Sequence, residues 1–103
     1  MTELVLADLT ILKTIIRKGN KIHFIDEQSI DMILNSGIYA SCYMPLGLFI
    51  YAYGEGRFCA VDNSDCNAWT EDFNSEYAAI RFLIDENFDL EKYNARVQKK
   101  QVV

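Results

Sequence analysis

The sequence predicts one small acidic α+β domain with two N-terminal helices, a four-stranded antiparallel sheet and two C-terminal helices. The chain has 103 residues, the size of a single domain, so residues 1–103 are treated as one unit. Apolar residues recur at helical spacing toward both ends and alternate in the middle. The connections between the middle segments look too short for a crossover helix, which favours antiparallel strands.

The first predicted helix runs from Thr2 to about Lys18. Apolar side chains recur along it at steps of four, three and four residues, and this stripe consists of Val5, Leu9, Leu12 and Ile16. Gly19 is expected to be its left-handed C-terminal residue. A short extended piece at residues 21–25 follows. Asp26 is then expected to cap a second helix that reaches about Ser36 and ends at Gly37.

Turn residues divide the middle of the chain into four expected strands. The turns are residues 45–47, 54–56 and 63–67, of which Gly54-Glu55-Gly56 is the strongest hairpin signal. The strands are expected at Ile38–Met44, Leu48–Tyr53, Arg57–Asp62 and Ala68–Phe73. Asn74 or Ser75 then caps a third helix, and Asp89 caps a fourth from Leu90 to about Gln101.

Charge is distributed unevenly along the chain. The net charge is −5, yet residues 26–91 hold thirteen acidic side chains and only two basic ones, Arg57 and Arg81. Most basic residues lie before or after this segment. The acidic balance disfavours direct binding to nucleic acid or to anionic membranes, because both need clustered Lys and Arg. An acidic middle either keeps the surface soluble or meets a basic partner.

The three cysteines, Cys42, Cys59 and Cys66, contain no CxxC pair and accompany a single histidine, so no zinc pattern is expected. Three unpaired thiols suit a reducing compartment, and we expect the protein in the cytoplasm. No apolar run approaches the roughly 18 residues of a membrane span. The N-terminus lacks the basic region of a secretory signal.

Motifs for catalysis or phosphate binding, such as GxGxxG, GxSxG and HExxH, are absent from the sequence. Two chemical alternatives stay open. His23 with Cys59 or Cys66 would form a thiol-dependent site. Oxygen side chains of residues 62–67 would hold calcium, although the glycine and distal glutamate of an EF-hand loop are missing. We favour a protein that is not an enzyme and carries no metal or cofactor.

Alternation along the first two predicted strands gives the sheet one aliphatic face and one tyrosine-rich face. Tyr39, Ser41 and Tyr43 share the tyrosine-rich face with Phe49, Tyr51 and Tyr53. Helices covering both faces would bury these rings. An exposed tyrosine face would instead suit a partner interface or a homodimer, because tyrosine offers large contact area with few rotatable bonds.

Carboxylates surround the aromatic residues where the last strand meets the third helix. Glu71, Asp72 and Glu76 flank Trp69 and Phe73, and Asp62 and Asp65 lie in the preceding turn. Carboxylates on a rigid hairpin imitate the phosphates of a nucleic acid and are attracted by a basic channel. A solvated acidic rim is the alternative. The predicted partner-binding residues are Asp62, Asp65, Glu71, Asp72, Glu76, Tyr51 and Tyr53.

Residues 59–64, 68–73 and 77–83, which read CAVDNS, AWTEDF and YAAIRFL, resemble the strand–turn–strand–helix ends of small phage and mobile-element proteins. Some of these are anti-CRISPR inhibitors, several of which are acidic and block the nucleic-acid site of an effector. The resemblance covers about a quarter of the chain. It implies a protein partner with a basic surface, such as a nuclease or CRISPR effector.

The sequence therefore predicts a non-enzymatic, protein-binding inhibitor of the anti-CRISPR type. The alternative is a structural or regulatory interaction domain that homodimerises through the tyrosine-rich face.

Overall fold

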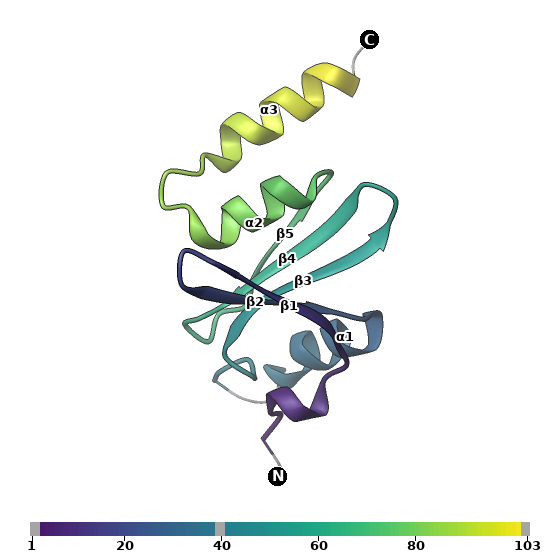
Figure 1. The fold of residues 1–103 in the computed structure, drawn as a ribbon, viewed down its shortest axis with the longest axis vertical. Coiled ribbons are helices and arrows are strands. Elements are labelled where there is room, and N and C mark those ends of the chain that lie inside the picture. Colours follow the sequence, from purple (N-terminus) through teal and green to yellow (C-terminus); the bar gives the residue numbers. More distant parts are fainter. Residues whose placement is uncertain (1–2, 39–40, 102–103) are drawn as a thin grey trace.

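The computed structural model describes residues 3–38 and 41–101, which form one five-stranded sheet between helices (Figure 1). A short helical turn at Leu6–Asp8 precedes the sheet. The remaining elements, in chain order, are β1 (Ile11–Arg17), β2 (Asn20–Ile25), α1 (Glu27–Ser36), β3 (Gly47–Gly54), β4 (Arg57–Asn63), β5 (Trp69–Phe73), α2 (Glu76–Ile84) and α3 (Leu90–Gln101). The strands lie in sequence order, and β2 and β3 are parallel while the other neighbours are antiparallel.

Helices cover both faces of the sheet, so the molecule has three layers (Figure 1). On one side, here called the α1 face, Ile30 and Ile33 of α1 pack with Phe49 and Val61. On the opposite side, the α2 face, a second buried cluster contains Ile22, Phe24, Ile50, Ala60, Phe73, Ala78, Ala79 and Leu83. Burial on both sides explains why the inner strands are almost continuously apolar.

The predicted N-terminal helix is wrong, because residues 11–17 form strand β1. The stripe at helical spacing competes with a run of β-branched residues, including Ile11, Thr14 and Ile15, which favour a strand. Lys18 and Gly19, both with positive φ, make the two-residue turn that joins β1 to β2. Gly19 thus belongs to a hairpin and not to a helix end.

The predicted strand Ile38–Met44 and the all-antiparallel sheet are also wrong. Residues 41–46 are bends without strand pairing, and Tyr39 and Ala40 lie outside the described residues. The chain between β2 and β3 contains α1, which is long enough to serve as a crossover connection. A crossover places β3 beside β2 in the same direction, so the sheet is mixed.

From Asp26 to Gly37, and from β3 onward, the predicted helices and strands are confirmed to within a residue or two. Asp26 caps α1 by accepting a hydrogen bond from the Ser29 N–H at 2.9 Å, and Gly37 follows the last helical residue. Ser75 caps α2 in the same way, and Asp89 accepts from the Lys92 N–H at the start of α3. The α+β class is therefore correct, although two helices were expected where one helix and two strands exist.

Candidate binding surface

The five predicted carboxylates do not form one surface. Asp62 and Asp65 lie at the turn between β4 and β5. Within β5, Glu71 pairs with Ala60 and points to the α2 face, whereas Asp72 pairs with Cys59 and points to the α1 face. Glu76 begins α2 and reaches Lys13 of β1, with 3.7 Å between Nζ and Oε1.

Asp62 and Asp65 bind their own turn. Asp62 accepts hydrogen bonds from the backbone N–H and the hydroxyl of Ser64 at 3.0 and 2.7 Å. Asp65 accepts from the Asn67 N–H and from the indole N–H of Trp69, each at 3.2 Å. Hydrogen bonds from Asn67 and then Trp69 lower the pKa of Asp65. These carboxylates shape the turn, as Asx turns do, and among the described residues no three His, Cys, Asp or Glu side chains converge on a metal position.

Of the tyrosines predicted to share one face, the structure describes Tyr43, Tyr51 and Tyr53. Tyr51 and Tyr53 alternate along β3 onto the α1 face, and their ring centroids lie 5.7 Å apart. Tyr43 packs instead against the buried α1-face cluster, over Gly37, where an added Cβ would lie 2.6 Å from the ring. Tyr39 lies outside the described residues. Because residues 41–46 form no strand, Tyr43 is not a cross-strand neighbour of Tyr51 or Tyr53.

Carboxylates from two different elements lie on the same side of the sheet as Tyr51 and Tyr53: Asp72 is brought there by the register of β4 with its neighbours, and Glu27 and Asp31 by the packing of α1. Partial burial and then Glu27 and Asp31 of α1 raise the pKa of Tyr51. Partial burial and then Asp72 of β5 raise the pKa of Tyr53. We call this set, namely Tyr51, Tyr53, Asp72, Glu27 and Asp31, the tyrosine–carboxylate patch. Arg57 is the basic residue beside it.

Glu27 and Asp31 were missed because they lie far from the tyrosines in sequence. Their spacing of four residues puts both on one exposed side of α1. Only the crossover of α1 onto the α1 face brings that side next to β3. The sequence shows the spacing of Glu27 and Asp31, but it does not show which side of the sheet α1 covers.

Cys59 lies beside the patch, and its thiol is unreactive as a nucleophile. It is buried, and desolvation followed by the neighbouring Asp72 raises its pKa to about 12. A thiol with such a pKa stays protonated near neutral pH and is a poor nucleophile. His23 pairs with Phe49, and Phe49 with Val61, so His23 lies two strands away from Cys59. The geometry therefore provides no contact between the imidazole and this thiol.

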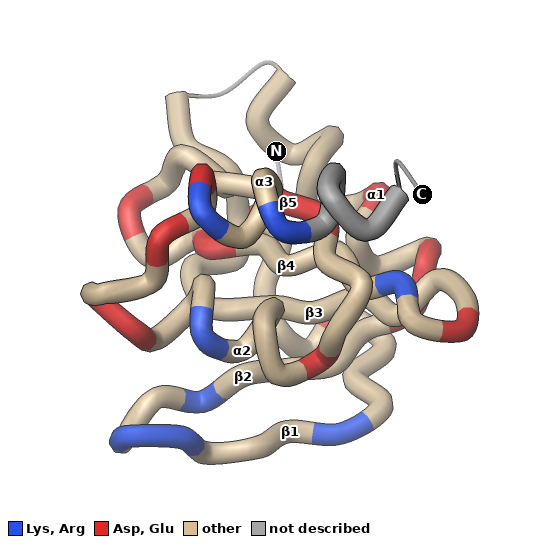
Figure 2. The backbone as a smooth tube through the Cα atoms, turned by 90° about the horizontal axis from the view of Figure 1, so that it is seen from above, with Lys and Arg blue, Asp and Glu red and all other residues tan. Residues whose placement is uncertain are grey.

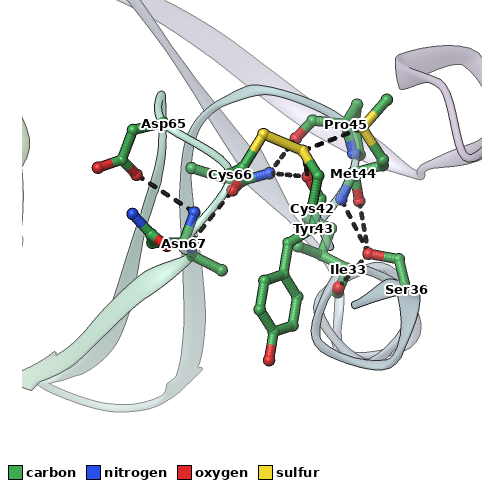
Figure 3. The surroundings of a disulfide bond; sticks show 11 residues. Ile33, Ser36, Cys42, Tyr43, Met44, Pro45, Asp65, Cys66 and Asn67 are labelled. Atoms are coloured by element: carbon green, nitrogen blue, oxygen red, sulfur yellow. Dashed lines mark hydrogen bonds between the residues drawn. A yellow bond between two sulfur atoms is a disulfide. The ribbon is translucent and has the colours of Figure 1, made fainter. Parts of the chain in front are cut away.

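The expectation of three unpaired thiols is wrong, because Cys42 and Cys66 form a disulfide (Figure 3). This bond joins the loop after α1 to the turn between β4 and β5. Ser36 holds the same loop by accepting from the Met44 N–H at 2.8 Å and donating to the Ile33 carbonyl at 2.6 Å. Cys66 is thus not a free thiol for a site with His23, and the thiol argument no longer supports a reducing compartment.

The fold turns the uneven sequence charge into a spatial separation (Figure 2). No acidic residue occurs from Ile11 to Ile25, and the β1–β2 hairpin carries Lys13, Arg17, Lys18 and Lys21. A pocket of about 390 Å³ lies between this hairpin and α2, lined in part by Arg17, Tyr77 and Arg81. Arg81 is already paired with Asp85 at 3.0 Å.

Comparison of the chain with known protein families, curated protein sequences and solved structures found no match. Within the part of the chain that the structure describes, no helix has both the length and the apolar character needed to cross a bilayer.

Proposed function

We propose that this protein is a non-catalytic binding module that docks a basic protein surface through the tyrosine–carboxylate patch. The observation that carries the proposal is that Glu27 and Asp31 from α1 and Asp72 from β5 lie on the side of the sheet that holds two neighbouring tyrosines, and that their charges act on these rings. Two elements that are far apart in sequence therefore supply one acidic aromatic surface.

The chemistry of the patch fits Arg-rich and Lys-rich partners. Carboxylates accept charge-assisted hydrogen bonds, which are bidentate when the donor is arginine. Tyrosine rings provide contact area at a low entropy cost and stack with guanidinium groups. Tyr51 is half buried against the α1-face cluster, so its ring is held in place before a partner arrives. An acidic surface that only keeps the protein in solution would need no aromatic side chain held in place at its centre.

The patch favours a different protein over a second copy of this chain. In a homodimer built on the two tyrosines, Glu27, Asp31 and Asp72 of one copy would approach the same three carboxylates of the other copy. Like charges brought together across an interface oppose association. The alternative function, homodimerisation through the tyrosine face, is therefore less well supported than binding to a basic protein.

A narrower form of the proposal follows from the sequence resemblance. The basic surface would be the nucleic-acid channel of a nuclease or CRISPR effector in a bacterial cytoplasm, and the patch would occupy it in place of nucleic acid. In this form Asp72, Tyr51 and Tyr53 make the contact. Asp62 and Asp65 shape their turn, and Glu76 faces Lys13.

The test compares two triple variants as baits for proteins in a bacterial lysate. The patch variant combines Glu27→Gln, Asp31→Asn and Asp72→Asn. The control combines Glu3→Gln, Glu86→Gln and Glu91→Gln, which remove the same charge at exposed positions elsewhere. Circular dichroism establishes that both variants remain folded.

We expect the wild type and the control to enrich the same basic nucleic-acid-binding proteins, and the patch variant to lose them. Retention should also fall with added salt, because screening shortens the reach of surface charges to about 8 Å at physiological ionic strength. Equal loss in both variants would mean that only net charge matters. Equal retention in both would contradict the proposed function.

A further inference from the structure

The strand β1 ends the sheet, and its outer edge has no neighbour among the described residues. It is seven residues long and contains neither proline nor glycine. An edge strand exposes backbone N–H and C=O groups that can pair with another strand. A bulge between Ile11 and Lys13 interrupts the pairing with β2, and from Lys13 to Arg17 the register is regular. This regular stretch is the part of the edge that can accept another strand.

Exposed apolar side chains accompany this edge. Leu12 and Ile16 are 67% and 61% exposed, among the largest values for apolar residues in the described chain. On the other side of the strand, Lys13 and Arg17 point toward the α2 face. An added strand would therefore gain apolar contact on one face and meet cations on the other.

The cations of the hairpin are mostly without acidic partners. Lys13 pairs with Glu76 and lies 4.4 Å from the centroid of the Phe24 ring. Among the described residues, Arg17, Lys18 and Lys21 have no carboxylate oxygen within the 4.0 Å of a salt bridge. A basic edge of this kind attracts an acidic segment.

The same charges disfavour pairing of β1 with β1 of a second copy. An antiparallel dimer centred on Ile15 would place Lys13 of one chain opposite Arg17 of the other. Like charges directly opposite each other destabilise a sheet. Lysine at an edge commonly prevents such self-pairing, while leaving the edge available to a strand of opposite charge.

We propose that β1 accepts an extended acidic segment of a partner protein as a sixth strand, paired along Lys13–Arg17. Backbone hydrogen bonds supply the pairing, Leu12 and Ile16 receive its apolar side chains on one face, and Arg17 and Lys18 receive its carboxylates on the other. This surface is distinct from the tyrosine–carboxylate patch, since β1 and β5 are opposite edges of the sheet. The inference stands whether or not the patch binds a basic protein.

The test uses a synthetic peptide of alternating valine and glutamate and three comparisons. A matched peptide with lysine in place of glutamate tests charge, and one with alternate backbone nitrogens methylated tests strand pairing. The protein variant Arg17→Glu/Lys18→Glu is compared with Lys92→Glu/Arg96→Glu, which makes the same charge change on exposed residues of α3. Binding is followed through the backbone amide shifts of the protein in NMR spectra, and sedimentation reports self-association.

We expect the acidic peptide to shift the amides of residues 13–17. We expect binding at least about tenfold weaker for the lysine peptide, for the methylated peptide and for Arg17→Glu/Lys18→Glu, with Lys92→Glu/Arg96→Glu close to wild type. Equal binding of the methylated peptide, shifts confined to α3, or no binding by the wild type at about 1 mM peptide would overturn the proposal. A dimer whose interface is β1 would overturn it as well.

Discussion

The two faces of the sheet are closed in different ways. On the α2 face, α2 and α3 lie over an aromatic cluster in which Phe73, Phe82, Phe88 and Tyr93 have ring centroids 5.2 to 6.3 Å apart. On the α1 face, one helix covers part of the sheet, and the neighbouring loop is held by a disulfide and by side-chain hydrogen bonds. Both faces hold a buried apolar cluster, but on the α1 face a disulfide and polar contacts hold the loop in addition, and Tyr53 is left 40% exposed.

The largest effect should come from the aromatic cluster. Phe73 is 3% exposed and contacts Phe82, Phe88 and Tyr93. We expect Phe73→Ala to lower the free energy of unfolding by about 3–5 kcal/mol, because it removes buried area and leaves a cavity. On the α1 face, Tyr51→Ala should cost distinctly less, because Tyr51 is only half buried. Urea denaturation measures both, and equal costs would remove the proposed difference between the faces.

Loss of the disulfide should be the next largest effect. Cys42 and Cys66 are 24 residues apart in sequence, so cross-linking them restricts the unfolded chain. The chain-entropy relation gives about 3–4 kcal/mol for a loop of this length. We expect the double variant Cys42→Ser/Cys66→Ser to be destabilised by this order in chemical denaturation. A stability equal to that of the wild type would mean that polar contacts alone hold the loop.

Those polar contacts converge on Asn63, which is fully buried. Its amide donates to the carbonyls of Tyr43 and Pro45, both at 2.8 Å, and its oxygen accepts from the Ala68 N–H at 3.1 Å. We expect Asn63→Ala to cost about 1–3 kcal/mol, because the partners lose their hydrogen bonds.

The variant Asn63→Asp is the more demanding control. It keeps an acceptor for Ala68 but loses both donors and buries a carboxylate beside two carbonyl oxygens, so it should cost at least as much as Asn63→Ala. Denaturation at neutral pH compares the two variants. A milder effect for Asn63→Asp would show that the donors to Tyr43 and Pro45 contribute little.

The differing success of sequence reasoning along the chain has a physical cause. Asp26, Ser75 and Asp89 cap helices through hydrogen bonds to residues three positions ahead, so the signal is local and readable. In β1 the apolar spacing indicated a helix, while Ile11, Thr14 and Ile15 favoured a strand. The partner β2 decided the outcome, and strand pairing is a non-local interaction.

The candidate site was predictable in part for the same reason. Tyr51 and Tyr53 alternate on one strand, which the sequence shows directly. That Asp72 shares their face depends on the register of β4 with β5, and that Glu27 and Asp31 join them depends on the parallel crossover. An odd number of cysteines likewise carried no information on which two would meet, since their pairing depends on the loop after α1.

The smallest expected effect concerns His23, which is half buried on the α1 face. Its Nδ1 lies 2.8 Å from the hydroxyl oxygen of Thr14, and its ring centroid is 5.8 Å from that of Phe49. Burial, and secondarily the charge of Lys21, lowers the pKa of His23 below its ordinary value of 6.5. The folded protein therefore binds this proton less readily than the unfolded chain. The contribution of neutral His23 to stability is complete above the unfolded pKa and is lost as the pH falls from there toward the folded pKa.

We expect the free energy of unfolding to decrease from about pH 7.5 to pH 5.5 in the wild type, and this slope to be reduced in His23→Gln, whose side chain does not titrate. Denaturant titrations at several pH values measure the slope.

The lowered pKa values of Asp26, Asp65 and Asp85 act in a separate pH window, because their stabilising effect is lost only as the pH falls below the ordinary range of aspartate, about 3.9. With a single histidine in the sequence, a slope near pH 6.5 assigns proton sensitivity to the α1 face. An unchanged slope in His23→Gln would mean that the pKa of His23 is the same in the folded and unfolded protein. The α1 face would then be more hydrated around His23 than its contacts with Phe49 and Thr14 imply.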